Sequence, residues 1–306
     1  MADSRQTTAV APIDRVVARI QAVYGRWNRS TSVEQMRKDW DALFWSDAVS
    51  VGTESVDADG VDAGWISAAG AHRDRVLIYF HGGGYKMGSV ISHQDLMARL
   101  SGAAACRVLG VNYRLLPEHG FPAPVEDACA VYGWVLEQGI APENIVFAGD
   151  SAGGGLAAAT LIALRDRGRR LPAAGVMLSA WTDLEARGAS YETRAQADPI
   201  HQRAMILMLA RQYLGASGNP RDPLASPLHG DLRGLPPLLL QVGDRETGLD
   251  DSRMFADKAR AAGVEVRLEV WDGMIHVFQQ FAAELPEARR AIANIGGFLN
   301  SIWSKS

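Results

Sequence analysis

Residues 144–153 of the chain read NIVFAGDSAG, an apolar run that ends in a serine between small residues. The run has the β-branched and aromatic residues of a buried strand, and the stretch GGGLAAATLIALR (153–165) that follows it has the composition of a buried helix. The G-x-S-x-G motif between them therefore lies at a strand-to-helix turn, where only small neighbours let the backbone turn so sharply. This turn predicts an exposed nucleophile at Ser151. Its supporting residues are Gly149, Asp150 and Gly153.

On both sides of this turn, strand-like runs alternate with helix-like runs. The strand-like runs are VLIYF (76–80), RVLGVNY (107–113), GVMLSAW (175–181), PLLLQVG (237–243) and VEVRLEVW (264–271), preceded by the shorter VSVGT (49–53) and GWIS (64–67). Helices are expected over 125–138, 153–167 and 251–262, with a closing helix that ends near Trp303. The alternation is typical of a mostly parallel sheet with helices on both faces, so an α/β fold is expected.

Two segments fall outside this alternation and are expected to form a cap. Residues 1–47 carry apolar side chains at helical spacing in two runs, from Ile13 to Trp27 and from Val33 to Phe44, before the main strands begin. Residues 182–235 interrupt the alternation with charged and turn residues and no apolar strand. The predicted domains are the N-terminal cap helices (1–47), the catalytic core (48–181 and 236–306) and a cap insertion (182–235).

Two helix starts are predicted inside the cap segments. Thr31 followed by Glu34 indicates a capping box at the second N-terminal helix. Asp198 followed by Pro199 indicates a helix start within the insertion, because aspartate is a good N-cap and proline is favoured at the first helical position. This start leads into MILMLARQYL (205–214).

A second motif, His81-Gly82-Gly83-Gly84, follows the strand-like run 76–80. Three successive glycines leave peptide N–H groups unshielded, so these groups can point into a cavity and stabilise a developing oxyanion. Gly-rich loops also form flexible turns or cradle phosphates. No G-K-[ST] follows this loop and the next strand-like run lacks an acid placed to hold a ribose, which argues against a nucleotide.

Activation of a serine hydroxyl requires a general base, and histidine suits that role at neutral pH. The chain contains seven histidines: His72, His81, His93, His119, His201, His229 and His276. Only His276 follows the last strand-like run and precedes the closing helix, where the chain order serine, acid, histidine requires the base. His276 is therefore the predicted base.

Together these motifs resemble those of the bacterial hormone-sensitive-lipase-like branch of the α/β-hydrolase carboxylesterases. The resemblance runs from about residue 76 to the end, apart from most of the insertion, and is carried by HGGGY (81–85), YRLLPEHGFPAPVEDA (113–128), GDSAGG (149–154), SPLHGDLRGLPPLLLQVGD (226–244) and WDGMIHVF (271–278). It implies an α/β-hydrolase fold with an eight-stranded, mostly parallel sheet and a helical cap. It also implies an oxyanion hole formed by Gly83, Gly84 and Ala152, with His81 and Gly82 organising the loop. The family positions that imply a buried ion network are Arg114, Glu118, Glu126 and Asp127.

Several carboxylates could orient His276. The family pattern in this loop is Asp-Pro-Leu-x-Asp/Glu, and the chain departs from it, offering Asp244, Glu246, Asp250 and Asp251. Asp222-Pro223-Leu224 matches the pattern but precedes the strand-like run 237–243, on the wrong side for a triad. Matching Asp250 to the second acid of the pattern places Glu246 at the catalytic position, and its spacing of 30 residues to His276 (276 − 246) resembles the family's. Glu246 is therefore preferred over Asp244, and Asp250 is expected to fix the loop or a helix start.

The resemblance implies a serine carboxylesterase that hydrolyses esters of small to medium acyl chains through an acyl-enzyme. The same triad could serve a lactone, amide or carbamate hydrolase or an acyltransferase, and a non-catalytic binding protein is a remote alternative. The N-terminal helices and residues 205–213 are expected to line the acyl pocket, although these helices could equally pad the core. The predicted pocket residues are Tyr85, Met205, Met208, Leu209, Ile275 and Val277.

Composition argues against several other classes. The 306 residues are 47% hydrophobic and 22% charged with a net charge of −4, which suits a large core and gives no positive field for nucleic acid. No window approaches about 18 consecutive apolar residues, so no membrane span is expected. Residues 1–15 lack a seven-residue apolar stretch, so no signal peptide is expected there. Cys106 and Cys129 are expected to be free thiols in a reducing cytoplasm.

No metal or cofactor is expected, because the sequence lacks clustered metal ligands. The strand-like run 264–271 is expected at the edge of the sheet, where unpaired backbone groups need covering, and it therefore predicts a possible homodimer.

Overall fold

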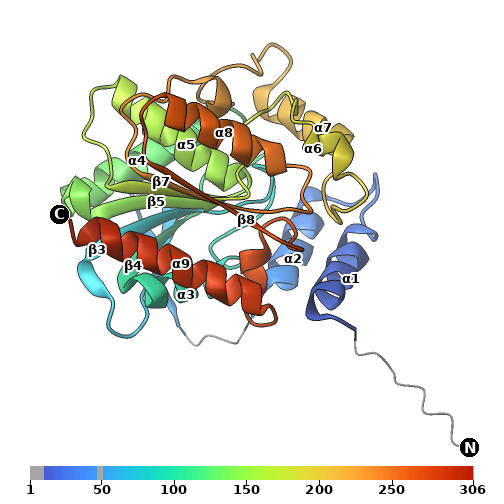
Figure 1. Cartoon of the computed structure of the whole chain (residues 1–306), viewed down its shortest axis with the longest axis horizontal. Coiled ribbons are helices and arrows are strands. Elements are labelled where there is room, and N and C mark those ends of the chain that lie inside the picture. The colour runs from blue at the N-terminus through green and yellow to red at the C-terminus, as the bar shows by residue number, and fades with distance from the viewer. Residues whose placement is uncertain (1–9, 47–50, 306) are drawn as a thin grey trace, which may run out of the picture.

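The computed structural model describes residues 10–46 and 51–305, and within them the strands form one eight-stranded sheet (Figure 1). Along the sheet the strand order is β1-β2-β4-β3-β5-β6-β7-β8. The strands are β1 (Thr53–Asp57), β2 (Asp62–Ile66), β3 (His72–Phe80), β4 (Cys106–Val111), β5 (Ile145–Asp150), β6 (Ala174–Leu178), β7 (Leu238–Gly243) and β8 (Val266–Trp271). The pairings of β1 with β2 and of β2 with β4 are antiparallel and the others are parallel, so the mostly parallel sheet is confirmed.

Helices cover both faces of this sheet (Figure 1). On one face lie α4 (Ala123–Glu137), α5 (Ala152–Asp166) and α8 (Leu249–Ala261), and on the other lie α3 (Gln94–Ala104) and α9 (Pro286–Trp303). Successive side chains of β3 alternate between the two layers, with Ile78 and Phe80 in the first and Leu77 and Tyr79 in the second. A strand segment buried on both faces therefore reads as a continuous apolar run, as residues 76–80 of β3 do.

The strand register brings loops that are distant in sequence to one edge of the sheet. Phe80 at the end of β3 is in register with Gly149 near the end of β5, so the HGGG loop and the serine turn emerge side by side. Gly243 at the end of β7 is likewise in register with Trp271 at the end of β8. The loops that carry Glu246 and His276 are therefore also neighbours, at the carboxyl edge where parallel sheets place their sites.

The two predicted cap segments lie on the same side of the molecule (Figure 1). The N-terminal segment forms α1 (Pro12–Tyr24) and α2 (Val33–Phe44), whose buried side chains join the apolar layer of α3 and α9. The ring centroids of Phe44 and Phe281 are 5.5 Å apart, and Arg19 pairs with Glu284 at 2.6 Å. The segment between β6 and β7 forms α6 (Ser190–Thr193), α7 (Arg203–Leu214) and the 3₁₀ turn η2 (Pro227–His229). Further 3₁₀ turns are η1 (Pro142–Asn144) and η3 (Phe278–Phe281).

Both predicted helix starts in the cap are wrong. The N-cap of α2 is Ser32, whose hydroxyl accepts the Gln35 N–H at 3.1 Å, whereas the Thr31 hydroxyl accepts from Asn28 N–H and closes the preceding turn. α7 begins only at Arg203, because the Asp198 carboxylate forms a local turn instead of capping a helix.

Other boundaries differ by small amounts or lie outside the described residues. The predicted extended run 49–53 falls partly on residues 47–50, which the structure does not describe, and β1 begins at Thr53. No helix within 10–46 or 51–305 has the length and hydropathy needed to cross a membrane. Cys106 and Cys129 are both free, as predicted.

Candidate active site

Ser151 lies in the sharp turn between β5 and α5, with a backbone φ of 53° and ψ of −120°. This left-handed φ is strained for a residue with a side chain, and the turn is held by hydrogen bonds of the Ser151 peptide group. Its N–H donates to Leu178 C=O at 2.8 Å, and its C=O accepts from Gly155 N–H at 3.0 Å. A Cβ atom on Gly153 would overlap the carbonyl oxygen of Phe80, which is the physical reason for the motif's last glycine.

The carboxylate of Asp150 joins the serine turn to the HGGG loop. Its Oδ1 accepts from Tyr79 Oη at 2.8 Å and Gly82 N–H at 3.0 Å, and it lies 3.2 Å from Nε2 of His93. Burial by itself raises the pKa of Asp150, but the contacts with His93 and Tyr79 outweigh burial and lower it. Asp150 is therefore a fixed carboxylate, and His93 is a member of this site that no motif in the sequence indicated.

The HGGG loop and the start of α5 present three unpaired peptide N–H groups. Gly83 and Gly84 have φ values of 115° and 65°, a conformation that only glycine adopts without strain. Across the part of the chain that the structure describes, no acceptor lies against the N–H of Gly83, Gly84 or Ala152. Ala152 is the first residue of α5, so its N–H lies at the positive end of the helix dipole.

His81 organises the HGGG loop from inside. Its Nδ1 lies 2.8 Å from Gly82 O, and its ring stacks on Tyr113 with centroids 4.4 Å apart. Burial lowers the pKa of His81 to about 3, so the ring is neutral at working pH. These contacts fit the organising role that the resemblance implied.

His276 and Glu246 meet between the loops that follow β8 and β7. Nδ1 of His276 lies 2.8 Å from Oε2 of Glu246, which is fully buried. Oε1 of Glu246 accepts from Ser179 Oγ at 2.7 Å and from Gly243 N–H at 2.5 Å. Ser179 Oγ also accepts a hydrogen bond from the N–H of Val277 at 3.0 Å. One hydroxyl therefore binds both the loop that carries Glu246 and the loop that carries His276.

The second ring nitrogen of His276, Nε2, has no hydrogen-bond partner among the described residues. It is buried, and His276 lines the same cavity as Ser151. Burial by itself lowers the pKa of His276, but the carboxylates of Glu246, Asp198 and Asp150 raise it above its usual value. The ring is thus oriented through Nδ1 and open at Nε2, the arrangement that a general base needs.

The other acidic residues of this region bind elsewhere. Oδ1 of Asp244 accepts from Gly273 N–H at 2.7 Å, and Oδ2 of Asp250 accepts from Ser190 N–H at 2.8 Å. Oδ2 of Asp251 accepts from the N–H groups of Thr182 and Asp183, each at 3.0 Å. Asp222 accepts locally from Leu224 N–H. Among the candidates, only Glu246 contacts His276.

A largely apolar cavity of about 150 Å³ opens from Ser151 and His276 between the core and both cap segments. Four predicted pocket residues line it: Met205, Met208, Leu209 and Val277. The N-terminal helices contribute Tyr24, Trp27, Met36, Trp40 and Phe44, so they line the cavity and pack on the core as well. Trp181, Ile200 and His201 also line it and were not predicted, because their motif-free positions gave no signal.

The predictions of Tyr85 and Ile275 as pocket residues are wrong. The ring of Tyr85 stacks on Tyr213 of α7 with centroids 3.9 Å apart and is 2% exposed. Ile275 is fully buried in the apolar layer with α9. Each residue neighbours a glycine-rich or histidine motif in sequence but turns its side chain into the core, an orientation that adjacency in sequence does not determine.

The predicted buried ion network is wrong in part. Arg114 does bind the buried Asp127 through Nε at 2.8 Å, but its own side chain and that of Glu126 are 41% and 57% exposed. Glu118 instead pairs with Arg37 of α2 at 2.7 Å. The Glu118–Arg37 pair therefore joins the core to the N-terminal cap segment.

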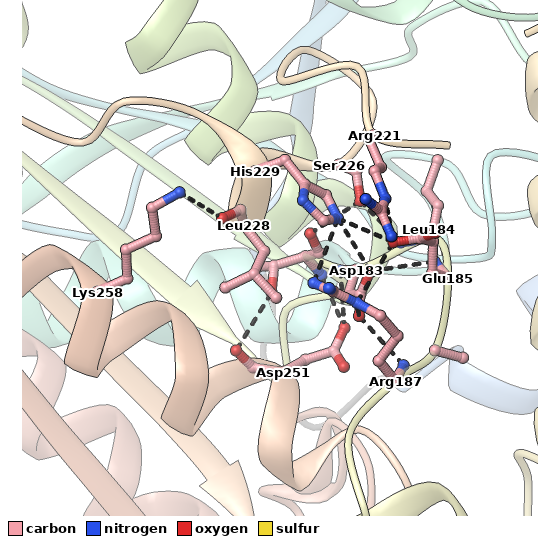
Figure 2. A network of polar contacts seen from close by, with 12 residues as sticks. Asp183, Leu184, Glu185, Arg187, Arg221, Ser226, Leu228, His229, Asp251 and Lys258 are labelled. Atoms are coloured by element: carbon pink, nitrogen blue, oxygen red, sulfur yellow. Dashed lines mark hydrogen bonds and ion pairs between the residues drawn. The ribbon is translucent and has the colours of Figure 1, made fainter. Parts of the chain in front are cut away.

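A second polar cluster lies where the cap insertion leaves β6 (Figure 2). Asp183, Glu185 and His229 bring three possible ligand atoms within 4.8 Å of one another, a spacing at which a metal ion could be held. Figure 2 shows two arginines reaching into the same cluster, and Arg187 and Arg221 lie 3.1 Å from Asp183 and 2.9 Å from Glu185. Their positive charges already balance both carboxylates, so the cluster fits an ion-pair network better than a cation site.

The chain is similar to known proteins over most of its length. Residues 77–280 match a family model described as alpha/beta hydrolase fold. The chain is 48% identical over 239 residues to an acetyl-hydrolase of Streptomyces hygroscopicus, covering 78% of this chain and 79% of the relative. It is 36% identical over 234 residues to an esterase of Acinetobacter venetianus, covering 76% and 77%.

The chain is also similar in fold and sequence to solved structures. A crystal structure of an esterase from the bacterial hormone-sensitive lipase family superposes with a TM-score of 0.91 at 47% identity, covering 99% of this chain and all of that one. A crystal structure of EstE5 soaked with p-nitrophenyl butyrate superposes with a TM-score of 0.88 at 38% identity, covering 94% of this chain and 99% of that one.

Proposed function

Because the chain belongs to the α/β-hydrolase family and is a carboxylic-ester hydrolase of its hormone-sensitive-lipase branch, we propose that Ser151, His276 and Glu246 are its catalytic triad. The observation that carries this assignment is the state of the His276 ring. Its Nδ1 is held by the buried Glu246 at 2.8 Å while its buried Nε2 is unpaired among the described residues and lines the cavity that contains Ser151.

The reaction then follows from the roles of these groups. Ser151 Oγ attacks the ester carbonyl carbon while Nε2 of His276 takes the hydroxyl proton, and Glu246 stabilises the resulting imidazolium through Nδ1–H. The carbonyl oxygen becomes an oxyanion that accepts hydrogen bonds from the N–H groups of Gly83, Gly84 and Ala152. The tetrahedral intermediate collapses, the alcohol leaves with the proton from His276, and water repeats the sequence on the acyl-serine.

We propose small to medium acyl chains as the preferred substrates. The cavity of about 150 Å³ is bordered by both cap segments and lined mainly by apolar side chains, which suits a short acyl or alcohol group. One relative that matches most of this chain is named an acetyl-hydrolase, which supports a short acyl group.

The test is a series of p-nitrophenyl esters from acetate to palmitate, run beside a lactone, an anilide and a carbamate. We expect the highest kcat/KM at acetate to hexanoate, a steep fall at longer chains and little turnover of the other three classes. Ser151→Ala should remove nearly all activity, and a fluorophosphonate should label the wild-type protein at Ser151 alone. Full activity in the alanine variant would overturn the assignment, and faster lactone or anilide turnover would replace the substrate class.

Assembly and compartment are proposals as well. β8 is the last strand of the sheet and Val270 on it is 41% exposed, so we propose that this edge pairs with a second copy in a homodimer. Light scattering after size exclusion should give twice the chain mass, and Val270→Lys should reduce the measured mass to that of one chain.

We also propose that the free thiols reflect a reducing cytoplasm, and cell fractionation tests this location.

A further inference from the structure

Asp198 is a buried carboxylate in the cap insertion, although aspartate is usually found at the surface. It is 5% exposed and lies between α6 and α7. Its Oδ1 accepts from the N–H groups of Ile200 and His201, each at 2.9 Å. These bonds fold the chain into a tight turn before α7 and fix the direction in which His201 leaves the backbone.

The other carboxylate oxygen binds the loop that carries the proposed acid. Oδ2 of Asp198 accepts from Thr247 N–H at 2.8 Å and from Thr247 Oγ1 at 3.0 Å. Thr247 directly follows Glu246 in the chain. One carboxylate from the cap insertion therefore fixes the residue beside the acid that orients His276.

The turn at Asp198 also delivers a second imidazole to the site. The rings of His201 and His276 meet edge to face, with centroids 4.2 Å apart and an interplanar angle of 89°. Burial lowers the pKa of His201 to about 3, so this ring is neutral when the enzyme works. His201 therefore brings no charge to His276, and the cap-insertion charge that acts on the His276 ring is that of Asp198.

We propose that Asp198 is a positioning residue for His276, which it serves by holding the acid loop through Thr247 and by supplying a second negative charge beside the ring. The cap insertion would then be part of the catalytic machinery and not only a cover for substrate. The inference rests on the proposed role of His276 as general base.

Titratable and charged groups from several elements surround His276, and each of them can influence the pH dependence of activity. Glu246 comes from the loop after β7, Asp198 and His201 from the insertion, and Asp150 with His93 from the core. Tyr24 of α1 and Lys86 of the HGGG loop line the same cavity, and Tyr191 and Asp251 line a smaller space of about 20 Å³ beside it. Asp198→Asn removes one negative charge from this set and leaves the rest in place.

The direction of the effect follows from the charge. A carboxylate near an imidazole favours the protonated ring, so it raises the pKa of His276. The acid limb of a kcat/KM profile reports that pKa in the free enzyme. Removing the charge of Asp198 must therefore move the midpoint of this limb to lower pH while weakening stabilisation of the imidazolium in the transition state.

The experiment compares pH profiles of the full chain with p-nitrophenyl acetate. For Asp198→Asn we expect the acid-limb midpoint to fall by about 0.5 to 1 unit, kcat to fall about tenfold and KM to change little. Glu192→Gln is the matched control, because Glu192 lies in the same insertion with its side chain 73% exposed, and it should keep the wild-type profile. A lower folded fraction scales the whole profile without moving the midpoint, so partial unfolding does not imitate the result.

Two further variants separate the effect of the charge of Asp198 from the effects of its hydrogen bond to Thr247 and of the His201 ring. Thr247→Val keeps the charge but loses one hydrogen bond to Asp198, so kcat should fall severalfold at an unchanged midpoint. His201→Phe keeps an edge-to-face ring and should retain the wild-type midpoint. A wild-type midpoint in Asp198→Asn, a shift of equal size in His201→Phe, or wild-type kcat in Thr247→Val would overturn the proposal.

If Asp198→Asn does not fold, the kcat of Thr247→Val tests the proposal by itself. These outcomes are distinct from failure of the proposed triad, which would appear as an active Ser151→Ala variant whatever Asp198 does.

Discussion

Glu246 is held by more donors than its partner requires. Besides His276, its carboxylate accepts from Ser179 Oγ and Gly243 N–H, and none of its surface reaches solvent. Such a carboxylate cannot rotate away when the ring becomes charged. Its geometry is therefore set before substrate arrives, which is the condition for efficient stabilisation of a transition state.

Replacement of Glu246 by glutamine should show this directly. The amide oxygen keeps the bonds from Ser179 and Gly243, which turns the amide NH₂ toward Nδ1 of His276 and favours the wrong tautomer. We expect kcat to fall by about 10³ to 10⁴ with little change in thermal unfolding. Asp244→Asn is the control and should lose far less activity; a crippled Asp244→Asn enzyme would contradict the assignment of the acid.

The residues of this site differ in how far the sequence could predict them. Ser151 and His276 are predicted from local motifs that have a fixed place relative to a strand end. Glu246 is predicted only through the family pattern that the resemblance supplies, because the chain offers several carboxylates in the same loop. Asp198 was misassigned, because an N-cap and an isolated aspartate turn use the same side-chain acceptor and the local sequence does not distinguish them. His93 and His201 reach the site through tertiary packing alone, which leaves no local pattern.

At the scale of elements, α9 carries two adjacent glycines in different surroundings. A Cβ atom on Gly296 would overlap the Ala103 carbonyl of α3, so this glycine allows the two helices to approach closely. A Cβ atom on Gly297 would meet nothing within 4 Å. The same residue type therefore serves packing at one position and only weakens the helix at the next.

Alanine substitutions at these two positions should have opposite effects. Gly297→Ala should raise the free energy of unfolding by about 0.5 to 1 kcal/mol, because alanine has the higher helix propensity. Gly296→Ala should lower it by about 1 to 3 kcal/mol through overpacking against α3. Denaturant unfolding at matched conditions measures both, and destabilisation of equal size in the two variants would contradict the packing argument.

Helices and strands could be predicted from the sequence where their burial produces a recognisable pattern of apolar residues. The strands β3, β5, β6 and β7 and the helices α5 and α8 were predicted within a few residues, since apolar runs bounded by turns mark them. β1 has mostly exposed side chains and so lacked such a run. The short α6 was not predicted, because its four residues carry too little periodicity.

At the scale of the whole molecule, Asp251 joins the cap insertion to the core. Its carboxylate in α8 accepts from the N–H groups of Thr182 and Asp183, where the insertion leaves the sheet (Figure 2). Burial, together with the charge of Asp183, raises the pKa of Asp251 to about 8. Since this pKa exceeds that of the unfolded chain, the folded state loses stability as pH rises between about 4 and about 8.

Asp251→Asn should therefore stabilise the protein at alkaline pH. The amide keeps an oxygen for both N–H donors and cannot ionise, so its advantage over wild type should grow from pH 4 to pH 8 and then level off, reaching several degrees in Tm. Asp257→Asn on the exposed side of α8 is the control and should give no pH-dependent difference. Thermal melts at pH 5 and pH 9 measure the effect, and an equal difference at both would contradict it.

The contact between α1–α2 and the segment around η3 has a consequence for biosynthesis. Phe44 packs on Phe281 and Arg19 pairs with Glu284, so part of the surface of the first helices is covered by residues made more than 230 positions later (281 − 44 = 237). A chain emerging from the ribosome carries this part of the surface uncovered through most of its synthesis, during which exposed apolar surface favours aggregation. A holding chaperone that recognises short apolar helices would therefore find its site on this protein in the segment synthesised first.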